Sequence, residues 1–120
     1  MCLYYELTKL NFDYAIRNCH NKFQATGRLF EPKTVAINSK AHKIGLDNVS
    51  GFYHSWIGVR QNKYASDGSP ILINPPWHGT GGTTYRKIDQ CLLYGNYPTP
   101  GKWVDSLCSR LFESICEPTM

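Results

Sequence analysis

The sequence predicts one mixed α+β domain that spans residues 1–120 and is held together by disulfide bonds. A length of 120 residues suits a single domain. Apolar residues in the first half recur at helical spacing, whereas the second half has short aromatic and β-branched runs separated by glycine, proline and asparagine. Five cysteines offer cross-links, from which a domain of this size gains stability.

The first predicted elements are a short strand at Tyr4–Leu7 and a helix after it. Asn11 is placed to cap this helix, because its side-chain oxygen can accept an amide hydrogen two or three positions further on. The helix has one apolar face, formed by Phe12, Ala15, Ile16, Cys19 and Phe23. We therefore expect Cys19 to be buried. Gly27 is expected to end this helical segment, and a second, weaker helix is predicted over about 34–43.

From Gly51 onward the sequence predicts strands and long loops. "SWIGVR" (55–60) and "CLLY" (91–94) are the clearest strands. Between them, the segment "WHGTGGTTYRKIDQC" (77–91) is rich in glycine and threonine. Long loops are uncommon in compact domains unless they carry a function, so we expect this segment to bind a ligand.

The charge pattern argues against binding to nucleic acid, and the lengths of the apolar runs argue against a membrane span. Thirteen Lys and Arg residues and nine Asp and Glu residues give a net charge of +4, but the cations are scattered along the chain. A nucleic-acid surface needs a concentrated basic patch that contacts several phosphates. The sequence also has no apolar run near the ~20 residues that span a bilayer.

The cysteines favour disulfides and an oxidising compartment. Their spacings contain no C-x-x-C pair, so zinc-ribbon, thioredoxin and haem interpretations lack their motifs. Cytosolic thiols are kept reduced, which favours a secreted, extracellular protein. The first residues, "MCLYYELTKL", do not have a signal-peptide pattern, so we expect the sequence to be the mature form.

Several motifs, taken in order and with their spacings, resemble the C-type lectin-like domain family. They are "GRLFEP", "SWIGVR", "SDGSP", "PPW", Cys91, "WVDSLC" and "FESICE". "GRLFEP" is most similar to secreted forms from marine invertebrates and bivalve molluscs. The resemblance covers roughly Cys2 to Glu117. It implies two helices, two small antiparallel sheets and a long binding loop.

The same resemblance implies two disulfides, Cys19–Cys116 and Cys91–Cys108. Closing loops of about 100 and about 15 residues would contribute about 5 and about 3 kcal/mol in the chain-entropy model. Cys2 is then left over. An odd cysteine in a secreted chain indicates a bridge between chains, so we expect a disulfide-linked homo- or heterodimer through Cys2, with a free thiol as the alternative.

The usual calcium ligands of the family are missing here. Many such lectins hold a sugar through calcium, which takes about six to eight oxygen ligands. The position of the Glu-Pro-Asn or Gln-Pro-Asp triplet falls on Gly81, Gly82 and Thr83, and Val104 replaces the asparagine before Asp105. Only Asp89 and Asp105 remain as candidates. We therefore expect no cofactor, and no tightly bound calcium at this site.

The leading interpretation is calcium-independent binding of a carbohydrate. The candidate sugar-binding residues are Asp89, Asp105, Tyr85, Thr83, Arg86 and Tyr97. His78 is a further polar candidate, and Tyr94 and Trp103 are further candidates for an aromatic face. An N-acetyl group offers a methyl to pack and an amide to hydrogen-bond, which favours N-acetylglucosamine or N-acetylgalactosamine. A role as an agglutinin in innate defence follows from the resemblance alone.

Two other functions compete with this one. Lectin-like domains that lack calcium ligands also recognise proteins, and aromatic and arginine residues anchor either kind of ligand. An enzyme or nucleotide-binding site is disfavoured, because "GTGG" matches neither the Rossmann nor the P-loop pattern.

Several further residues have simpler structural interpretations. Trp56 and Trp103 are favoured as core residues, since the matching tryptophans of the family are structural. Asp105 has an alternative role in bonding loop amides. The histidines His20, His42, His54 and His78 have no nucleophile motif beside them. "NVS" at Asn48 is an N-glycosylation sequon that chance alone would also produce.

Overall fold

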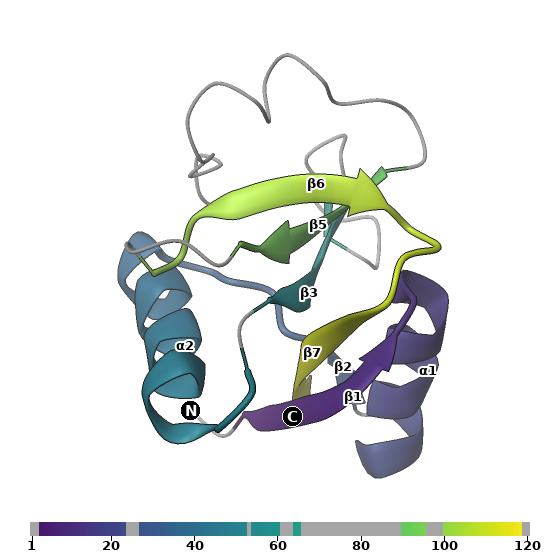
Figure 1. Cartoon of the computed structure of the whole chain (residues 1–120), viewed down its shortest axis with the longest axis horizontal. Helices are drawn as coiled ribbons and strands as arrows, with labels where there is room; N and C mark the ends of the chain where they lie inside the picture. The colour runs from purple at the N-terminus through teal and green to yellow at the C-terminus, as the bar shows by residue number, and fades with distance from the viewer. Residues whose placement is uncertain are drawn as a thin grey trace.

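The structure is a computed structural model that describes residues 3–23, 27–52, 54–60, 64–65, 90–95 and 100–118, with the backbone alone at 59, 60, 64, 65, 90 and 105. Two helices and seven strands make up this part of the chain (Figure 1). In chain order they are β1 Tyr4–Leu10, α1 Phe12–Phe23, β2 Gly27–Leu29, α2 Val35–Asn48, β3 Ser55–Arg60, β4 Tyr64–Ala65, β5 Gln90–Tyr94, β6 Trp103–Leu107 and β7 Phe112–Pro118. Every element predicted from the sequence pattern is present, and β1 and α2 are longer than predicted.

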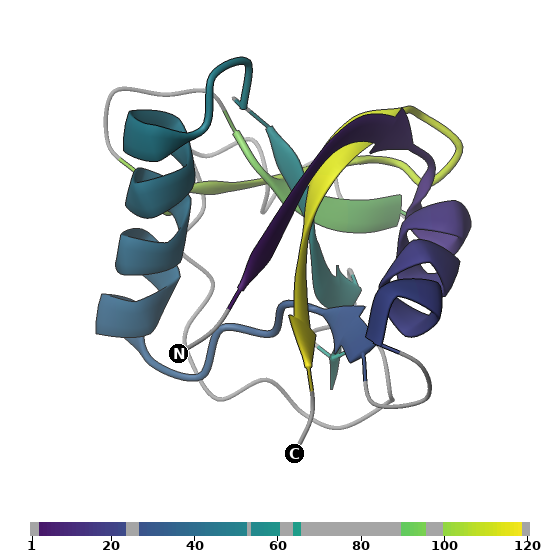
Figure 2. The same ribbon diagram turned by 90° about the horizontal axis from the view of Figure 1, so that it is seen from below.

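The strands form one sheet rather than two. Its order is β1-β7-β3-β5-β6, with β2 added at β7 and β4 at β3. All pairs are antiparallel except β3 and β7, which meet in parallel at Trp56 and Ser114. This one parallel contact joins the two antiparallel sheets that we expected into a single mixed sheet. The antiparallel pairing of β1 with β7 places these two strands, near the two ends of the chain, side by side (Figure 2).

Helix α1 begins and packs as its sequence predicts. The Asn11 side-chain oxygen accepts a hydrogen bond from the Tyr14 amide at 2.9 Å, and Phe12, Ala15 and Cys19 are buried. Gly27 has a different role from the predicted one, because it begins β2. A Cβ at this position would collide with the carbonyl oxygen of Cys19, so only glycine lets β2 lie this close to α1.

Helix α2 begins at a threonine cap and reaches the core through small and polar residues. The Thr34 hydroxyl accepts a hydrogen bond from the Ile37 amide at 3.1 Å. The buried residues of this helix are Asn38, Ala41, His42 and Gly45. A Cβ at Gly45 would lie 2.6 Å from the ring of Phe52, so this glycine lets the ring pack directly against the helix backbone.

The sheet separates two buried clusters, each covered by one helix (Figure 2). The α1-face cluster contains Phe12, Ala15, Cys19, Leu29, Trp56, Cys91, Leu93 and Cys116. The α2-face cluster contains Phe30, Ala41, Phe52, Ile57, Leu92, Tyr94, Trp103 and Ile115. Neighbouring residues along a strand belong to opposite clusters, as the two-residue period of a strand requires.

Both implied disulfides are confirmed. Cys19–Cys116 ties α1 to β7, and Cys91–Cys108 ties β5 to the residue after β6. Cys19 is fully buried, as its position on the helix predicted. Within the described residues, no helix is long and apolar enough to cross a membrane.

Candidate functional site

The structure describes the supports of the predicted binding loop rather than the loop itself. Five candidate residues lie outside the described residues: Thr83, Tyr85, Arg86, Asp89 and Tyr97. The same is true of His78 and Cys2. Asp105 lies in β6 with its backbone opposite Leu92 of β5, but its side chain is also outside the described part. The described part of the candidate site consists of β5, β6 and the groups that hold these strands.

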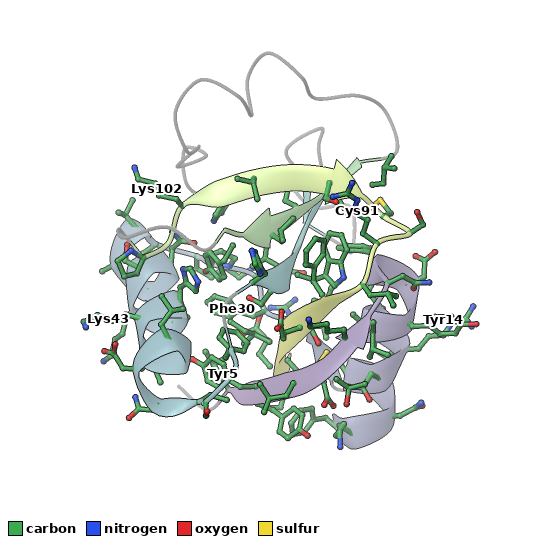
Figure 3. The ribbon with its side chains drawn as sticks, viewed as in Figure 1. Tyr5, Tyr14, Phe30, Lys43, Cys91 and Lys102 are labelled. Carbon is green, nitrogen blue, oxygen red and sulfur yellow. A yellow bond between two sulfur atoms is a disulfide. The ribbon has the colours of Figure 1, made fainter. Side chains whose placement is uncertain are left out.

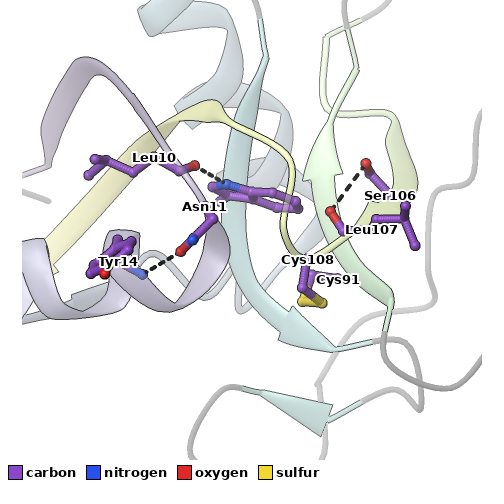
Figure 4. The surroundings of a disulfide bond; sticks show 8 residues. Leu10, Asn11, Tyr14, Cys91, Ser106, Leu107 and Cys108 are labelled. Atoms are coloured by element: carbon purple, nitrogen blue, oxygen red, sulfur yellow. Dashed lines mark hydrogen bonds between the residues drawn. A yellow bond between two sulfur atoms is a disulfide. The ribbon is translucent and has the colours of Figure 1, made fainter.

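The Cys91–Cys108 disulfide fixes both strands from the α1 face (Figure 4). Cys91 is fully buried within the α1-face cluster, and Cys108 packs against the same cluster. The Cys108 carbonyl accepts a hydrogen bond from the Phe12 amide at 3.0 Å, which attaches the bridge to the start of α1. Asp89 and Asp105 lie two and three residues before the bridged cysteines. One rigid covalent link thus anchors the chain on both sides of the candidate site.

A buried hydrogen-bond network fixes the same strands from the α2 face. Asn38 Oδ1 accepts bonds from the Tyr94 hydroxyl at 2.8 Å and from the Trp103 indole nitrogen at 2.9 Å. Asn38 Nδ2 donates to the Gly101 carbonyl at 2.8 Å. We call Asn38, His42, Tyr94, Gly101 and Trp103 the Asn38 hub. A single amide side chain thereby connects α2 to β5, to β6 and to the segment that leads into β6.

His42 completes the Asn38 hub one helical turn after Asn38. Its ring stacks on Tyr94 with centroids 4.5 Å apart and an interplanar angle of 7°. Its Nδ1 accepts a hydrogen bond from the Gly101 amide at 2.9 Å, so Nδ1 carries no proton in this arrangement. Gly101 has a φ of 90°, a conformation that favours glycine. The chain is thus fixed at the point where it turns into β6.

The tryptophans and the tyrosine that the structure describes in this region are core residues. Trp56 is fully buried, and its indole nitrogen donates to the Leu10 carbonyl at 2.7 Å (Figure 4). Trp103 is fully buried as well, which supports the core role expected for both tryptophans. The suggestion that Tyr94 and Trp103 offer a face to a sugar is wrong, because neither has any exposed surface. Burial raises the pKa of Tyr94 well above its ordinary value.

A second group of charges lies where β2 meets β7. Glu117 Oε1 accepts hydrogen bonds from the Glu31 amide at 2.8 Å and from Arg28 Nε at 3.3 Å. Lys33 pairs with the buried Glu31 carboxylate at 3.0 Å. Burial raises the pKa of Glu117, although the Glu31 amide and the Arg28 charge oppose the rise. These paired charges lie between β2, the following segment and β7.

Sequence reasoning did not single out Asn38 or His42 as buried partners. The available signal was their four-residue spacing, which places them on the same helix face as Ala41 and Gly45. Side chains elsewhere follow ordinary rules (Figure 3): Tyr5 and Phe30 point into the core, whereas Tyr14 and Lys43 point away from it.

The described histidines lie apart from one another in the fold. His20 is exposed on α1, His42 belongs to the Asn38 hub, and the ring of His54 lies 5.6 Å from that of Phe112. In the described ranges, no three His, Cys, Asp or Glu residues are arranged to hold a metal ion. Val104, at the position of a usual calcium ligand, is half-buried and packs against the α1-face cluster.

Comparison with solved structures identifies the fold. Human lithostathine superposes with a TM-score of 0.82 and 21% identity, over 99% of this chain and 83% of that one. The human scavenger receptor C-type lectin carbohydrate-recognition domain gives a TM-score of 0.76 and 21% identity, over 99% and 91%. SPL-1 in complex with GlcNAc gives 0.74 and 20% identity, over 96% and 85%. No protein-family model and no curated protein matches the sequence.

The chain therefore has the C-type lectin-like fold, an α+β architecture with two helices, a mixed sheet and two disulfides. The disulfides and the Asn38 hub hold β5 and β6 from opposite faces of the sheet. What they support is a fixed platform for the loop that connects β4 to β5.

Proposed function

We propose that this protein is a lectin that binds N-acetylated hexosamines without calcium. The observation that carries the proposal is the similarity of fold to C-type lectin domains, among them a structure determined with GlcNAc bound. The buried supports of β5 and β6 fit a recognition site, because rigid strands on either side of a ligand site lower the cost of binding.

The loop has the chemistry that such a sugar needs. Thr83, Arg86, Asp89 and Asp105 offer hydroxyl, guanidinium and carboxylate groups to sugar hydroxyls and to the acetamide. With Tyr94 and Trp103 in the core, the aromatic face for the acetyl methyl falls to Tyr85 and Tyr97. Specificity then rests on a few polar groups placed around an apolar contact.

The residues present do not fit the calcium site of related lectins. Gly81, Gly82 and Thr83 supply no carboxylate or side-chain amide, and Val104 is an apolar side chain packed against the α1-face cluster. Asp89 and Asp105 are only two side-chain ligands, whereas calcium takes roughly six to eight oxygen ligands. We infer that sugar binding here proceeds through direct hydrogen bonds.

The proposal includes a secreted, disulfide-linked dimer through Cys2, related to the lectins of bivalve molluscs. Two weak sites on one molecule raise avidity without new contacts, which suits an agglutinin of innate defence. Non-reducing electrophoresis of the protein and of a Cys2→Ser variant tests the dimer. A band at monomer mass for the unmodified protein would exclude it.

A glycan panel measured twice, with calcium and with a chelator, tests the main proposal. We expect binding to N-acetylated sugars in both conditions, lost in Asp89→Asn and Tyr85→Ala but kept in the control Lys40→Ala on the exposed side of α2. Binding abolished by the chelator would show that calcium is required. No binding in either condition would leave a protein partner as the better explanation.

A further inference from the structure

The sequon Asn48-Val49-Ser50 lies at the C-terminal end of α2. Asn48 is the last residue of the helix, and Val49 after it is extended, with φ −116° and ψ 107°. Val49 packs against the α2-face cluster, whereas Asn48 and Ser50 are exposed. The two functional residues of the sequon, Asn48 and Ser50, are therefore both open to solvent on either side of the anchored Val49.

Among the described residues, none crowds the turn after Asn48. Gly51 follows with a φ of 84°, and a Cβ added to it would meet no described atom within 4 Å. The end of α2 lies at the bottom of Figure 1, whereas β6 lies at the top. A large group attached to Asn48 would thus extend into solvent, away from the strands that support the candidate binding loop.

The local hydrogen bonds tolerate a substituent on Asn48. Its Nδ2 donates to the Ile44 carbonyl at 3.0 Å. An amide nitrogen carries two hydrogens, so substituting one leaves the other available for this bond. The helix end is also held independently, since the Val49 amide donates to the Gly45 carbonyl at 3.0 Å.

We propose that Asn48 is an acceptor site for an N-linked oligosaccharide. The co-substrate is an oligosaccharide carried on a lipid diphosphate, and the transfer is made by the host cell's glycosylation machinery. A bond forms between Asn48 Nδ2 and C1 of the first sugar as the C1–O bond to the diphosphate breaks. The diphosphate leaves with the electron pair, and Nδ2 gives up one proton. The two disulfides fit the oxidising secretory compartment in which this modification is made.

The test is to secrete the full chain from eukaryotic cells behind an added signal peptide and to map Asn48 by peptide mass spectrometry. We expect most secreted chains to carry a glycan at Asn48, and peptide N-glycosidase to remove it and convert the residue to aspartate. Ser50→Ala should abolish the modification, whereas Ser50→Thr should keep it. Both exchanges are at an exposed position and leave the core unchanged.

An unmodified Asn48 in secreted protein whose two disulfides have formed would overturn the proposal, whatever the Ser50→Thr variant shows. Thermal unfolding of the glycosylated protein and of Ser50→Ala provides a second measurement, and we expect the two midpoints to agree, because the glycan is attached at an exposed helix end. This site does not rest on the proposed sugar binding, so either proposal can fail without the other.

Discussion

The two faces of the sheet are joined to their helices by different chemistry. On the α1 face, Cys19–Cys116 links helix to strand covalently, inside a cluster of apolar side chains. Helix α2 contains no cysteine and is joined to the sheet by packing and by hydrogen bonds that meet at Asn38. A disulfide depends on two residues and tolerates changes around it. A hydrogen-bond hub depends on one side chain, whose loss removes a hydrogen bond from several buried groups at once.

Strands β5 and β6 are where the two kinds of support meet. Cys91 and Leu93 of β5 belong to the α1-face cluster, and Leu92 and Tyr94 to the α2-face cluster. A ligand loop carried by these strands is thereby held from both sides. Weakening one face at a time separates the contributions of the two.

The largest expected loss of stability follows removal of the long-range disulfide. Cys19 and Cys116 are 97 residues apart, and Cys91 and Cys108 are 17 apart. The Cys19→Ala/Cys116→Ala double variant should lose about 5 kcal/mol of unfolding free energy, and the Cys91→Ala/Cys108→Ala variant about 3 kcal/mol. Urea unfolding of both variants checks the order. Equal losses, or the reverse order, would contradict an account based on loop length.

The next largest effect is expected on the α2 face. Asn38→Leu removes the acceptor for Tyr94 and Trp103 and the donor for Gly101, all of them buried. The Tyr94 hydroxyl keeps the Asn38 backbone carbonyl as an acceptor at 3.1 Å, so the cost falls on the Trp103 indole and the Gly101 carbonyl. Losing such buried bonds costs about 1–3 kcal/mol each, so we expect a loss of about 3 kcal/mol or more in urea unfolding.

Two variants sharpen this result. Asn38→Asp keeps an acceptor oxygen, but when ionised it places a charge in the core and faces the Gly101 carbonyl with a second acceptor, so it should be less stable than the unmodified protein. Lys40→Ala on the exposed side of α2 should change stability by no more than about 0.5 kcal/mol. A loss below about 1 kcal/mol for Asn38→Leu would show that α2 is held by apolar packing instead.

The α1 side was more predictable from the sequence than the α2 side. The cap at Asn11 and the spacing of Phe12, Ala15 and Cys19 are local signals, and a helix with one apolar face follows from them. Helix α2 buries Asn38 and His42 and exposes Lys40 and Lys43, so polar residues occur on both faces and do not distinguish the buried side from the exposed one. Partners such as Gly101, 63 residues from Asn38, cannot be inferred from local periodicity.

Long-range pairing limited the prediction elsewhere too. The single parallel contact between Trp56 and Ser114 merges the predicted sheets, and no local pattern marks it. A glycine after a helical segment predicts a helix stop, but Gly27 is needed because β2 passes close to the Cys19 carbonyl of α1. The disulfides were obtained through family resemblance, because cysteine spacing alone leaves several pairings open.

The smallest expected effect comes from two carboxyls that respond oppositely to pH. Burial alone would raise the pKa of Glu6, but hydrogen bonds from Thr8 and from Asn18 of α1 outweigh it and lower the pKa below 4.5. Glu6 therefore stabilises the fold above about pH 4.5, and this stabilisation is lost as the pH falls through its folded-state pKa. Burial raises the pKa of Glu117 above 4.5, so its stabilising contribution is present below pH 4.5 and is lost as the pH rises through the raised pKa.

Urea unfolding of Glu6→Gln and Glu117→Gln across pH 3–7 measures both contributions. The free energy of unfolding of the unmodified protein should exceed that of Glu6→Gln at neutral pH, and this difference should shrink as the pH falls below about 4.5. The difference from Glu117→Gln should instead shrink as the pH rises above that value. Parallel curves would mean that neither carboxyl titrates differently in the folded protein. The opposite result would be a stability of the unmodified protein, relative to Glu117→Gln, that increases with pH. It would mean that the Arg28 charge and the Glu31 amide outweigh burial of Glu117. The ion pair would then be a net stabiliser of β7, the strand that also carries Cys116.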